Sequence, residues 1–379
     1  MHLAFITPEY PHEKVTHAAG IGTSIKNLVT ALKSQGVAVS IFVYSQATDE
    51  IFYENGIKIH LIKRKKYRFF TWFFYRKHLQ YYVNKYIEVD KINLVEAPDW
   101  TGIMAFINLK TPVIMRFHGS DAYFCKLEGR KQKLKNFWFE KLGTQKAKGF
   151  IAPTDFAGKL SKEIFGIKKE IQTIHNGLNI QDFENNSPDK FTPGMLLYIG
   201  TIIRKKGVFE LPQILKKVSE KNQEAHLVLI GSDSFDIQTQ SKSTWELVLN
   251  EADESVREKM TYLGKVPYAE VQQYIKNANI CLFPTFAETL GMVTIESMAL
   301  QKAVVNSNIG WANELIIDGE SGYLVHPKDH ELFSSRIISL CENKKNALQM
   351  GDKARRRVED TFDMSKIVHQ NIDFYRKQL

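Results

Sequence analysis

Two carboxylates, Glu288 and Glu296, lie eight positions apart in the stretch FAETLGMVTIESMAL, residues 286–300. The apolar run before it is typical of a buried strand, and apolar residues recur at helical spacing after Gly291. Gly291 leaves room for a ligand to approach the backbone, and the first free N–H groups of the predicted helix favour an anion. One carboxylate can accept hydrogen bonds from sugar hydroxyls and the other from a ribose, which favours a sugar nucleotide as the ligand. The alternative is that Glu296 caps its own helix and that Glu288 is merely solvated.

Two cations, Arg204 and Lys206, lie in YIGTIIRKKGVFELPQIL, residues 198–215, between a predicted strand that ends at Gly200 and a predicted helix. Cations are normally unfavourable at a helix N-terminus, because the helix dipole is already positive there. Their position is explained if a diphosphate lies between them. A solvated surface pair is the alternative.

A glycine-rich loop, GIGTS, places Gly20 and Gly22 before a predicted helix that ends at Gly36. Such loops can cradle phosphates. A dinucleotide-binding loop would have a third glycine where Ile25 stands, and an acidic residue where Ser45 and its apolar neighbours stand. Nicotinamide or flavin binding is therefore disfavoured, and an ordinary tight turn is the alternative to a phosphate loop.

The elements that would position these residues alternate between strands and helices in both halves of the chain, which is typical of doubly wound parallel sheets. The strand-like runs are HLAFIT, VAVSIFVYS, IKIHLI, NLVEAP, PVIMRFHG and GFIAPT in the first half, and MLLYIGTI, HLVLIG, MTYLGKV, NICLFPT, AVVNS and GYLVHP in the second. We therefore predict an α/β protein with two domains, residues 1–187 and 195–359, joined by the linker-like NNSPDKFTPG. Ligands of such sheets bind at the carboxyl ends of the strands.

These motifs together resemble the retaining GT-B glycosyltransferases of family four, also called group 1. The resemblance covers most of the chain and continues into SNIGWANELIIDGESGYLVHP, residues 307–327. It implies two Rossmann-like domains that face each other across a cleft, with the C-terminal helix, residues 360–379, packing back onto the acceptor-side N-terminal domain. Gln301 and Ala303 stand where the family commonly has Gly and Pro, which we interpret as a local packing difference.

The resemblance also implies roles for residues of the second domain. Thr289, Leu290 and Gly291 would bind the nucleotide sugar together with the two carboxylates, and Lys206 matches a lysine of the family that binds the diphosphate. Thr201 occupies the usual position of the partner arginine, so we expect Arg204 to substitute for it. Gly20 and Gly22 of the first domain would cover the donor phosphates or border the acceptor.

MRFHGSD closes a predicted strand of the first domain at His118. A histidine in this position is often only a hydrogen-bonded core residue, but the resemblance implies that it contacts the donor sugar. Glu96, Asp99 and Asp121 lie at neighbouring strand ends. They are candidates for acceptor contacts, although each could equally be a turn residue.

The net charge of +9 is concentrated in one part of the chain, because no Asp or Glu occurs between Asn55 and Ile87. Its nine cations are Lys58, Lys63, Arg64, Lys65, Lys66, Arg68, Arg76, Lys77 and Lys85. Large aromatic side chains are interleaved with them in KRKKYRFFTWFFYRK, residues 63–77. This composition favours an anionic membrane surface, to which each cation would contribute about 1 kcal/mol. A solvated basic helix is the alternative, and no nucleic-acid-binding motif accompanies the stretch.

Three widely spaced cysteines, Cys125, Cys281 and Cys341, do not predict a disulfide framework. The first residues lack a basic region followed by an unbroken apolar run, and no run approaches the roughly 20 apolar residues that span a bilayer. We therefore expect a cytoplasmic protein, peripheral on the inner face of the cell membrane if it binds lipid.

The leading hypothesis is a retaining glycosyltransferase of hexosyltransferase type, which moves a sugar from a nucleotide-diphosphate sugar to a carbohydrate or lipid-linked acceptor in cell-surface polysaccharide or lipopolysaccharide synthesis. The sequence has no Asp-x-Asp pair, so we expect no metal and no other cofactor. The alternatives are a sugar-nucleotide epimerase of similar fold and a non-catalytic, membrane-docked protein that binds sugar nucleotides.

Overall fold

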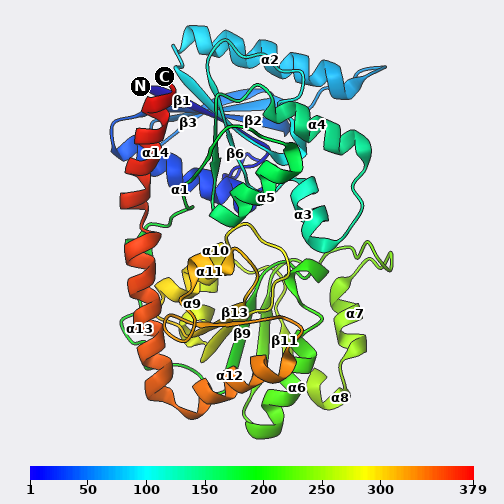
Figure 1. Cartoon of the computed structure of the whole chain (residues 1–379), viewed down its shortest axis with the longest axis vertical. Coiled ribbons are helices and arrows are strands. Elements are labelled where there is room, and N and C mark those ends of the chain that lie inside the picture. The colour runs from blue at the N-terminus through cyan, green and yellow to red at the C-terminus, as the bar shows by residue number, and fades with distance from the viewer. The chain divides into compact units, whose positions relative to one another are not determined.

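The computed structural model describes all 379 residues, which divide into two compact units (Figure 1). Unit 1 comprises Met1–Asn179 and Met364–Leu379, and unit 2 comprises Ile180–Asp363. The chain thus enters unit 2 once and returns, so that its last helix belongs to unit 1. None of the helices combines the length and the apolar character needed to cross a bilayer.

Unit 1 is built on an eight-stranded sheet in which β1, the first strand, lies in the interior between β2 and β5. In spatial order the strands are β3 (Glu50–Glu54), β4 (Ile57–Lys63), β2 (Ala38–Gln46), β1 (His2–Thr7), β5 (Leu94–Pro98), β6 (Val113–Arg116), β7 (Gly149–Ala152) and β8 (Ile171–Thr173). All pairings are parallel except that of β3 with β4. Strand β3 and the three-residue β8 were not predicted from the sequence. The β3–β4 hairpin has a turn at Asn55 and Gly56, which both have positive φ, and Asn-Gly is the strongest short hairpin signal.

Helices pack on both faces of this sheet, because successive side chains of its central strands point in opposite directions. Leu3 and Phe5 of β1 belong to one core cluster, whereas Ala4 and Ile6 belong to another. The first cluster includes residues of α1 (Gly20–Ser34) and α14 (Met364–Gln378), and the second includes residues of α2 (Thr71–Val89). The remaining helices are the 3-10 turn η1 (Trp100–Gly102), α3 (Asp121–Glu128), α4 (Leu134–Thr144) and α5 (Asp155–Phe165).

Unit 2 has a six-stranded, fully parallel sheet. Its order is β11 (Met260–Tyr262), β10 (His226–Ile230), β9 (Met195–Ile199), β12 (Ile280–Phe283), β13 (Val304–Ser307) and β14 (Tyr323–Val325), which are the six strands predicted from the sequence. Its helical elements are η2 (Ile180–Asp182), η3 (Arg204–Lys206), α6 (Leu211–Lys221), α7 (Thr244–Glu251), α8 (Glu254–Arg257), α9 (Tyr268–Asn277), α10 (Met292–Ala299), α11 (Ala312–Leu315), α12 (His330–Glu342) and α13 (Lys344–Thr361). Strand β9 is the first along the chain and lies between β10 and β12, so the strand order reverses there. In doubly wound sheets, that reversal is where ligands bind.

The predicted linker, residues 185–194, lies within unit 2. Asn185 Nδ2 donates to the carbonyl of Leu300 at 2.9 Å, and the N–H of Gly194 donates to Asn279 Oδ1 at 3.2 Å. The chain passes between the units earlier, after Asn179. Composition alone could not show this, because Pro, Gly, Asn and Ser are equally typical of a loop that packs on its own domain.

Candidate functional site

The loops that follow β9, β10 and β12 gather charged side chains at the carboxyl edge of the unit 2 sheet. Lys206, after β9, forms an ion pair with Glu288, after β12. Arg204, in the same turn as Lys206, forms an ion pair with Asp236, after β10. The pairs form because β9 lies between the other two strands, which brings residues 82 and 32 positions apart into contact.

The Lys206–Glu288 pair is partly open to solvent, with about a fifth of each side chain exposed. Glu288 Oε1 also accepts a hydrogen bond from the N–H of Thr289 at 3.0 Å. Burial alone would raise the pKa of Glu288, but the charge and hydrogen bond of Lys206 outweigh it and lower that pKa below its ordinary value. Glu288 is therefore an ionised acceptor at neutral pH, and its partner Lys206 is a cation that an entering anion can reach.

Backbone contacts fix the geometry of this pair. The N–H groups of Phe286 and Ala287 donate to the carbonyl of Lys205 at 2.8 and 3.2 Å. Gly207 has φ +72°, and a Cβ there would lie 1.7 Å from the carbonyl oxygen of Pro284. Only glycine permits this approach, so the loops after β9 and β12 are held together by main chain.

Arg204 is held on two sides. Its Nε and Nη2 donate to the two carboxylate oxygens of Asp236 at 2.6 and 3.0 Å, and its guanidinium lies 4.2 Å from the ring centroid of Phe209. The hydrogen bond from Arg204, with further ones from Thr239, lowers the pKa of Asp236 to about 2. Asp236 therefore holds Arg204 in place, while about a third of the Arg204 side chain stays exposed. The sequence pattern did not identify Asp236 as a partner. The one feature of the sequence that could have indicated Asp236 is its position in the loop after β10, the strand beside β9.

Glu296 is the fifth residue of α10, and it is only 7% exposed. Its Oε1 accepts a hydrogen bond from the hydroxyl of Tyr268 at 2.9 Å, and burial raises its pKa to about 7. The N-cap of α10 is Gly291, with φ +94° and no side-chain cap. The alternative that Glu296 caps its own helix is therefore wrong.

In unit 1, His118 follows β6, and its backbone N–H donates to Asp99 Oδ1 at 2.8 Å. Burial, with the nearby charge of Arg116, lowers the pKa of His118 to about 3, so its imidazole is neutral at pH 7. Asp99 is only 2% exposed, and burial raises its pKa to about 7. Its other oxygen, Oδ2, has no hydrogen-bond partner.

Two family models match the chain: residues 179–357 match the glycosyl transferases group 1, and residues 18–182 match glycosyltransferase family 4. The chain belongs to the group 1 glycosyltransferases. An uncharacterized glycosyltransferase of Methanocaldococcus jannaschii is 23% identical over 350 residues, 89% of each protein. The capsular polysaccharide biosynthesis glycosyltransferase CapM of Staphylococcus aureus is 27% identical over 215 residues, 55% of this chain and 51% of CapM.

The fold of this glycosyltransferase is GT-B. It matches HepE of Anabaena, solved in complex with UDP and glucose, with a TM-score of 0.76 over all of both chains at 14% identity. In unit 2 the structure brings together Lys206 and Glu288, places Thr289, Leu290 and Gly291 in the loop between β12 and α10, and leaves Arg204 paired with Asp236.

Gly20 and Gly22 of the glycosyltransferase lie at the start of α1, but its N-terminus already holds a carboxylate. The N–H of Gly22 donates to Glu9 Oε1 at 2.8 Å, and a Cβ on Gly22 would lie 3.0 Å from the Cα of Tyr10. The helix end thus attracts an anion, as expected, but Glu9 supplies it. Sequence reasoning missed Glu9 because glutamate is flexible and its partner lies 13 positions away.

Of the candidate acceptor residues, Glu96 is enclosed in the fold, and Asp121 has a partner but stays partly exposed. Glu96 lies inside β5 and is buried; its carboxylate binds Arg116 at 2.7 and 3.0 Å and accepts from the hydroxyl of Tyr375 in α14 at 2.6 Å. Asp121 forms an ion pair with Arg130 at 3.2 Å. The prediction that Glu96 is available to an acceptor is therefore wrong, because β5 is an interior strand and its side chains are enclosed.

No group of three or more His, Cys, Asp or Glu side chains is arranged to hold a metal ion. The expectation that the glycosyltransferase works without a metal stays a prediction.

Proposed function

We propose that the protein is a retaining hexosyltransferase that uses a nucleotide-diphosphate sugar as donor and a carbohydrate or lipid-linked glycan as acceptor. The observation that carries this proposal is the Lys206–Glu288 pair at the point where the strand order of unit 2 reverses. It combines a cation for the diphosphate with a carboxylate for sugar hydroxyls, and both are accessible. Family membership supports the reaction class.

In this proposal the donor exchanges partners with the ion pair. The diphosphate accepts hydrogen bonds from Lys206 and from the free N–H groups at the start of α10, while Glu288 turns from Lys206 to the hydroxyls of the donor sugar. Each charge-assisted hydrogen bond is worth roughly 1.5 to 3 kcal/mol. Thr289, Leu290 and Gly291 line the diphosphate through their backbone, and Arg204 contributes a further positive charge while Asp236 holds it.

The chemical step breaks the bond between the anomeric carbon and the diphosphate oxygen. The acceptor oxygen bonds to the same face of that carbon, and its proton passes to the leaving diphosphate. Catalysis is then electrostatic and geometric, because Lys206 stabilises the charge that develops on the leaving group. No metal is required in this scheme.

Glu296 is proposed to bind the ribose hydroxyls. Its buried carboxyl accepts a hydrogen bond from Tyr268, and its pKa is close to neutrality. His118, neutral at pH 7, can hydrogen-bond the donor sugar without adding a charge that would compete for the diphosphate. Gly20 and Gly22 border the substrates, with Glu9 as the anionic group at that helix end.

We further propose a role in cell-surface polysaccharide or lipopolysaccharide synthesis at the inner face of the cell membrane. The name of CapM, a capsular polysaccharide biosynthesis glycosyltransferase, supports the polysaccharide part of this proposal. The structure of HepE contains UDP, which makes UDP-sugars the first donors to test.

The test is a panel of sugar nucleotides assayed for release of free nucleoside diphosphate, with and without glycan acceptors. The proposal predicts release from at least one donor, stimulated by an acceptor. An epimerase would convert the sugar without releasing nucleoside diphosphate, and a binding protein would do neither.

A further inference from the structure

A second basic and aromatic segment accompanies residues 63–77 in unit 1. Residues 129–148, GRKQKLKNFWFEKLGTQKAK, contain one acidic residue, Glu140. Its carboxylate is buried and accepts hydrogen bonds from the N–H groups of Asp121 and Ala122 and from Gln132. The cations of this segment are Arg130, Lys131, Lys133, Lys135, Lys141, Lys146 and Lys148. Neither segment therefore exposes a negative charge.

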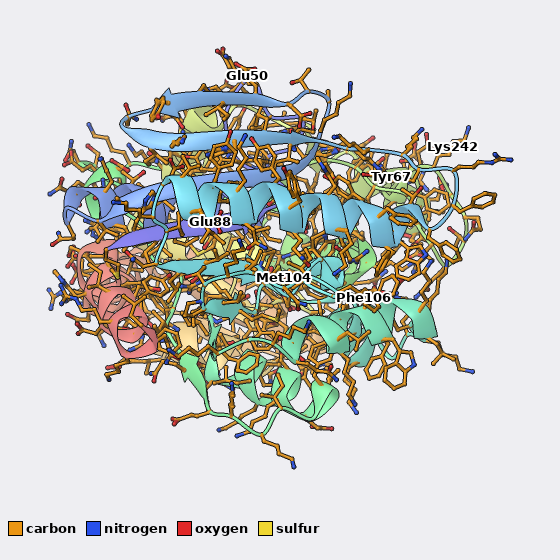
Figure 2. All side chains as sticks on the ribbon, turned by 90° about the horizontal axis from the view of Figure 1, so that it is seen from above. Glu50, Tyr67, Glu88, Met104, Phe106 and Lys242 are labelled. Atoms are coloured by element: carbon orange, nitrogen blue, oxygen red, sulfur yellow. The ribbon has the colours of Figure 1, made fainter.

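The structure joins these two segments into one surface. Trp72 of α2 packs on Phe139 of α4 with ring centroids 4.9 Å apart, and both rings contact Phe106 at 5.6 and 5.9 Å. Lys135 of α4 lies 5.4 Å above the ring of Trp72. In Figure 2, Tyr67 and Phe106 lie at the same end of α2, away from Glu88. The buried guanidinium of Arg76 reinforces the joint, because it donates to the carbonyl of Gly102 at 3.0 Å and lies over the ring of Phe139.

Large apolar side chains project from this joint surface, which we call the docking face. Phe69 and Phe70 are each 65% exposed, Trp138 is 53% exposed and Leu134 is 77% exposed. Single exposed apolar residues are ordinary, but a group of them ringed by cations marks an interaction site. The exposed cations of the docking face include Lys65, Lys66, Arg68, Lys131, Lys133 and Lys135.

Phe70 is also held in an unfavourable backbone conformation. It is the N-cap of α2, with φ +50° and ψ +39°, in the left-handed region. A bulky residue is rare there, where Asn or Gly is preferred. The ring of Phe70 has an edge contact with the ring of Trp72, with centroids 6.3 Å apart, but it stays largely exposed.

We propose that the docking face binds an anionic lipid bilayer, with Phe69, Phe70, Leu134 and Trp138 inserted at the headgroup level and the surrounding cations on the lipid phosphates. The combination favours a bilayer over a nucleic acid, because aliphatic Leu134 and several phenylalanines gain from leaving water while the cations keep anionic partners. The inference deepens the proposed function: a membrane-bound face would bring the enzyme to a lipid-linked acceptor.

Sedimentation with vesicles tests the charge contribution. Wild-type protein is mixed with vesicles of equal phosphatidylglycerol and phosphatidylcholine, or of phosphatidylcholine alone, at low and high salt. We expect binding to the anionic vesicles that weakens with salt, and roughly a hundredfold lower partitioning for Lys131→Ser/Lys133→Ser/Lys135→Ser. The matched control, Lys221→Ser/Lys345→Ser/Lys353→Ser, removes three exposed cations from unit 2 and should bind like wild type. Equal binding by both variants, no binding to anionic vesicles, or binding of duplex DNA in preference to vesicles would each overturn the proposal.

Phe70→Asn separates insertion from folding. Asparagine suits the left-handed backbone, so the variant should unfold at the same or a higher temperature, while its partitioning into anionic vesicles should fall several-fold. Bromine-labelled lipids should quench fluorescence in the wild type, and less so in Trp138→Phe. Unchanged partitioning of Phe70→Asn together with equal quenching of both proteins would show that no side chain inserts.

These readouts are independent of the proposed reaction. The Lys131→Ser/Lys133→Ser/Lys135→Ser variant should hydrolyse any identified donor at the wild-type rate, since its three substitutions lie outside unit 2. Vesicle binding without activity on any donor would support the membrane-binding role of the docking face and contradict the proposed function.

Discussion

The carboxyl edges of the two sheets carry similar residues and use them differently. In unit 2 the Lys206–Glu288 pair lies in loops and remains partly exposed. In unit 1 Glu96 and Arg116 lie within adjacent strands, are almost fully buried, and anchor α14 through Tyr375. An ion pair in loops can exchange a partner for a ligand, whereas one inside a sheet can only hold the fold. The same residue types therefore indicate a site only where the strand has already ended.

The largest effect that we predict comes from the buried pair. Glu96→Gln leaves the guanidinium of Arg116 without a countercharge, which typically destabilises a protein by about 3 to 5 kcal/mol. Chemical denaturation should show this loss, while the activity per folded molecule stays close to that of the wild type. A fully stable variant would mean that the Arg116 charge is compensated in another way.

The same glutamate-to-glutamine change at Glu288 in unit 2 should lower activity and leave stability nearly unchanged. Glu288→Gln, and likewise Lys206→Ala, should lower turnover at least about a hundredfold, the scale of one lost transition-state contact. Their unfolding free energies should change by no more than about 1 kcal/mol, because the pair is partly solvated. Steady-state kinetics with an identified donor and acceptor would check this, and wild-type turnover by Glu288→Gln would remove its proposed role.

A third prediction concerns the pH dependence of stability. The pKa of Glu296 is raised from 4.5 to about 7 in the folded protein. Between these values the unfolded chain has lost a proton that the folded protein still holds, so wild-type stability should fall as pH rises. Glu296→Gln has no carboxyl that titrates at this position. Its free energy of unfolding relative to wild type should therefore increase by roughly 2 kcal/mol from pH 5 to pH 7. Denaturation curves at both pH values measure the difference, and a pH-independent difference would contradict the raised pKa.

The smallest effect should be that of metal removal. If positive side chains and helix amides neutralise the leaving diphosphate, activity should persist in excess EDTA. Complete loss that magnesium or manganese restores would reveal a metal requirement that the charged groups of unit 2 do not replace.

The sequence predicted the unit 2 sheet well, because its strands are short apolar runs bounded by glycine, proline or polar residues. It also predicted that Glu288 and Lys206 follow strands. It could not predict which side chains pair, because the pairs depend on strand order: Asp236 meets Arg204 only because β10 lies beside β9. Glu9 was missed for a similar reason, and Glu96 was misjudged because a glutamate inside a strand and one at its end look alike in sequence.

The most direct test of the central claim, that the Lys206 loop of unit 2 binds a nucleoside diphosphate, is calorimetric titration with UDP, GDP, ADP, CDP and dTDP. We predict that at least one nucleotide binds the wild type, and that Lys206→Ala binds it at least about tenfold more weakly while Glu96→Gln, below its unfolding temperature, binds it normally. Equal affinity of wild type and Lys206→Ala for every nucleotide that binds, or no binding by the wild type at all, would contradict the account.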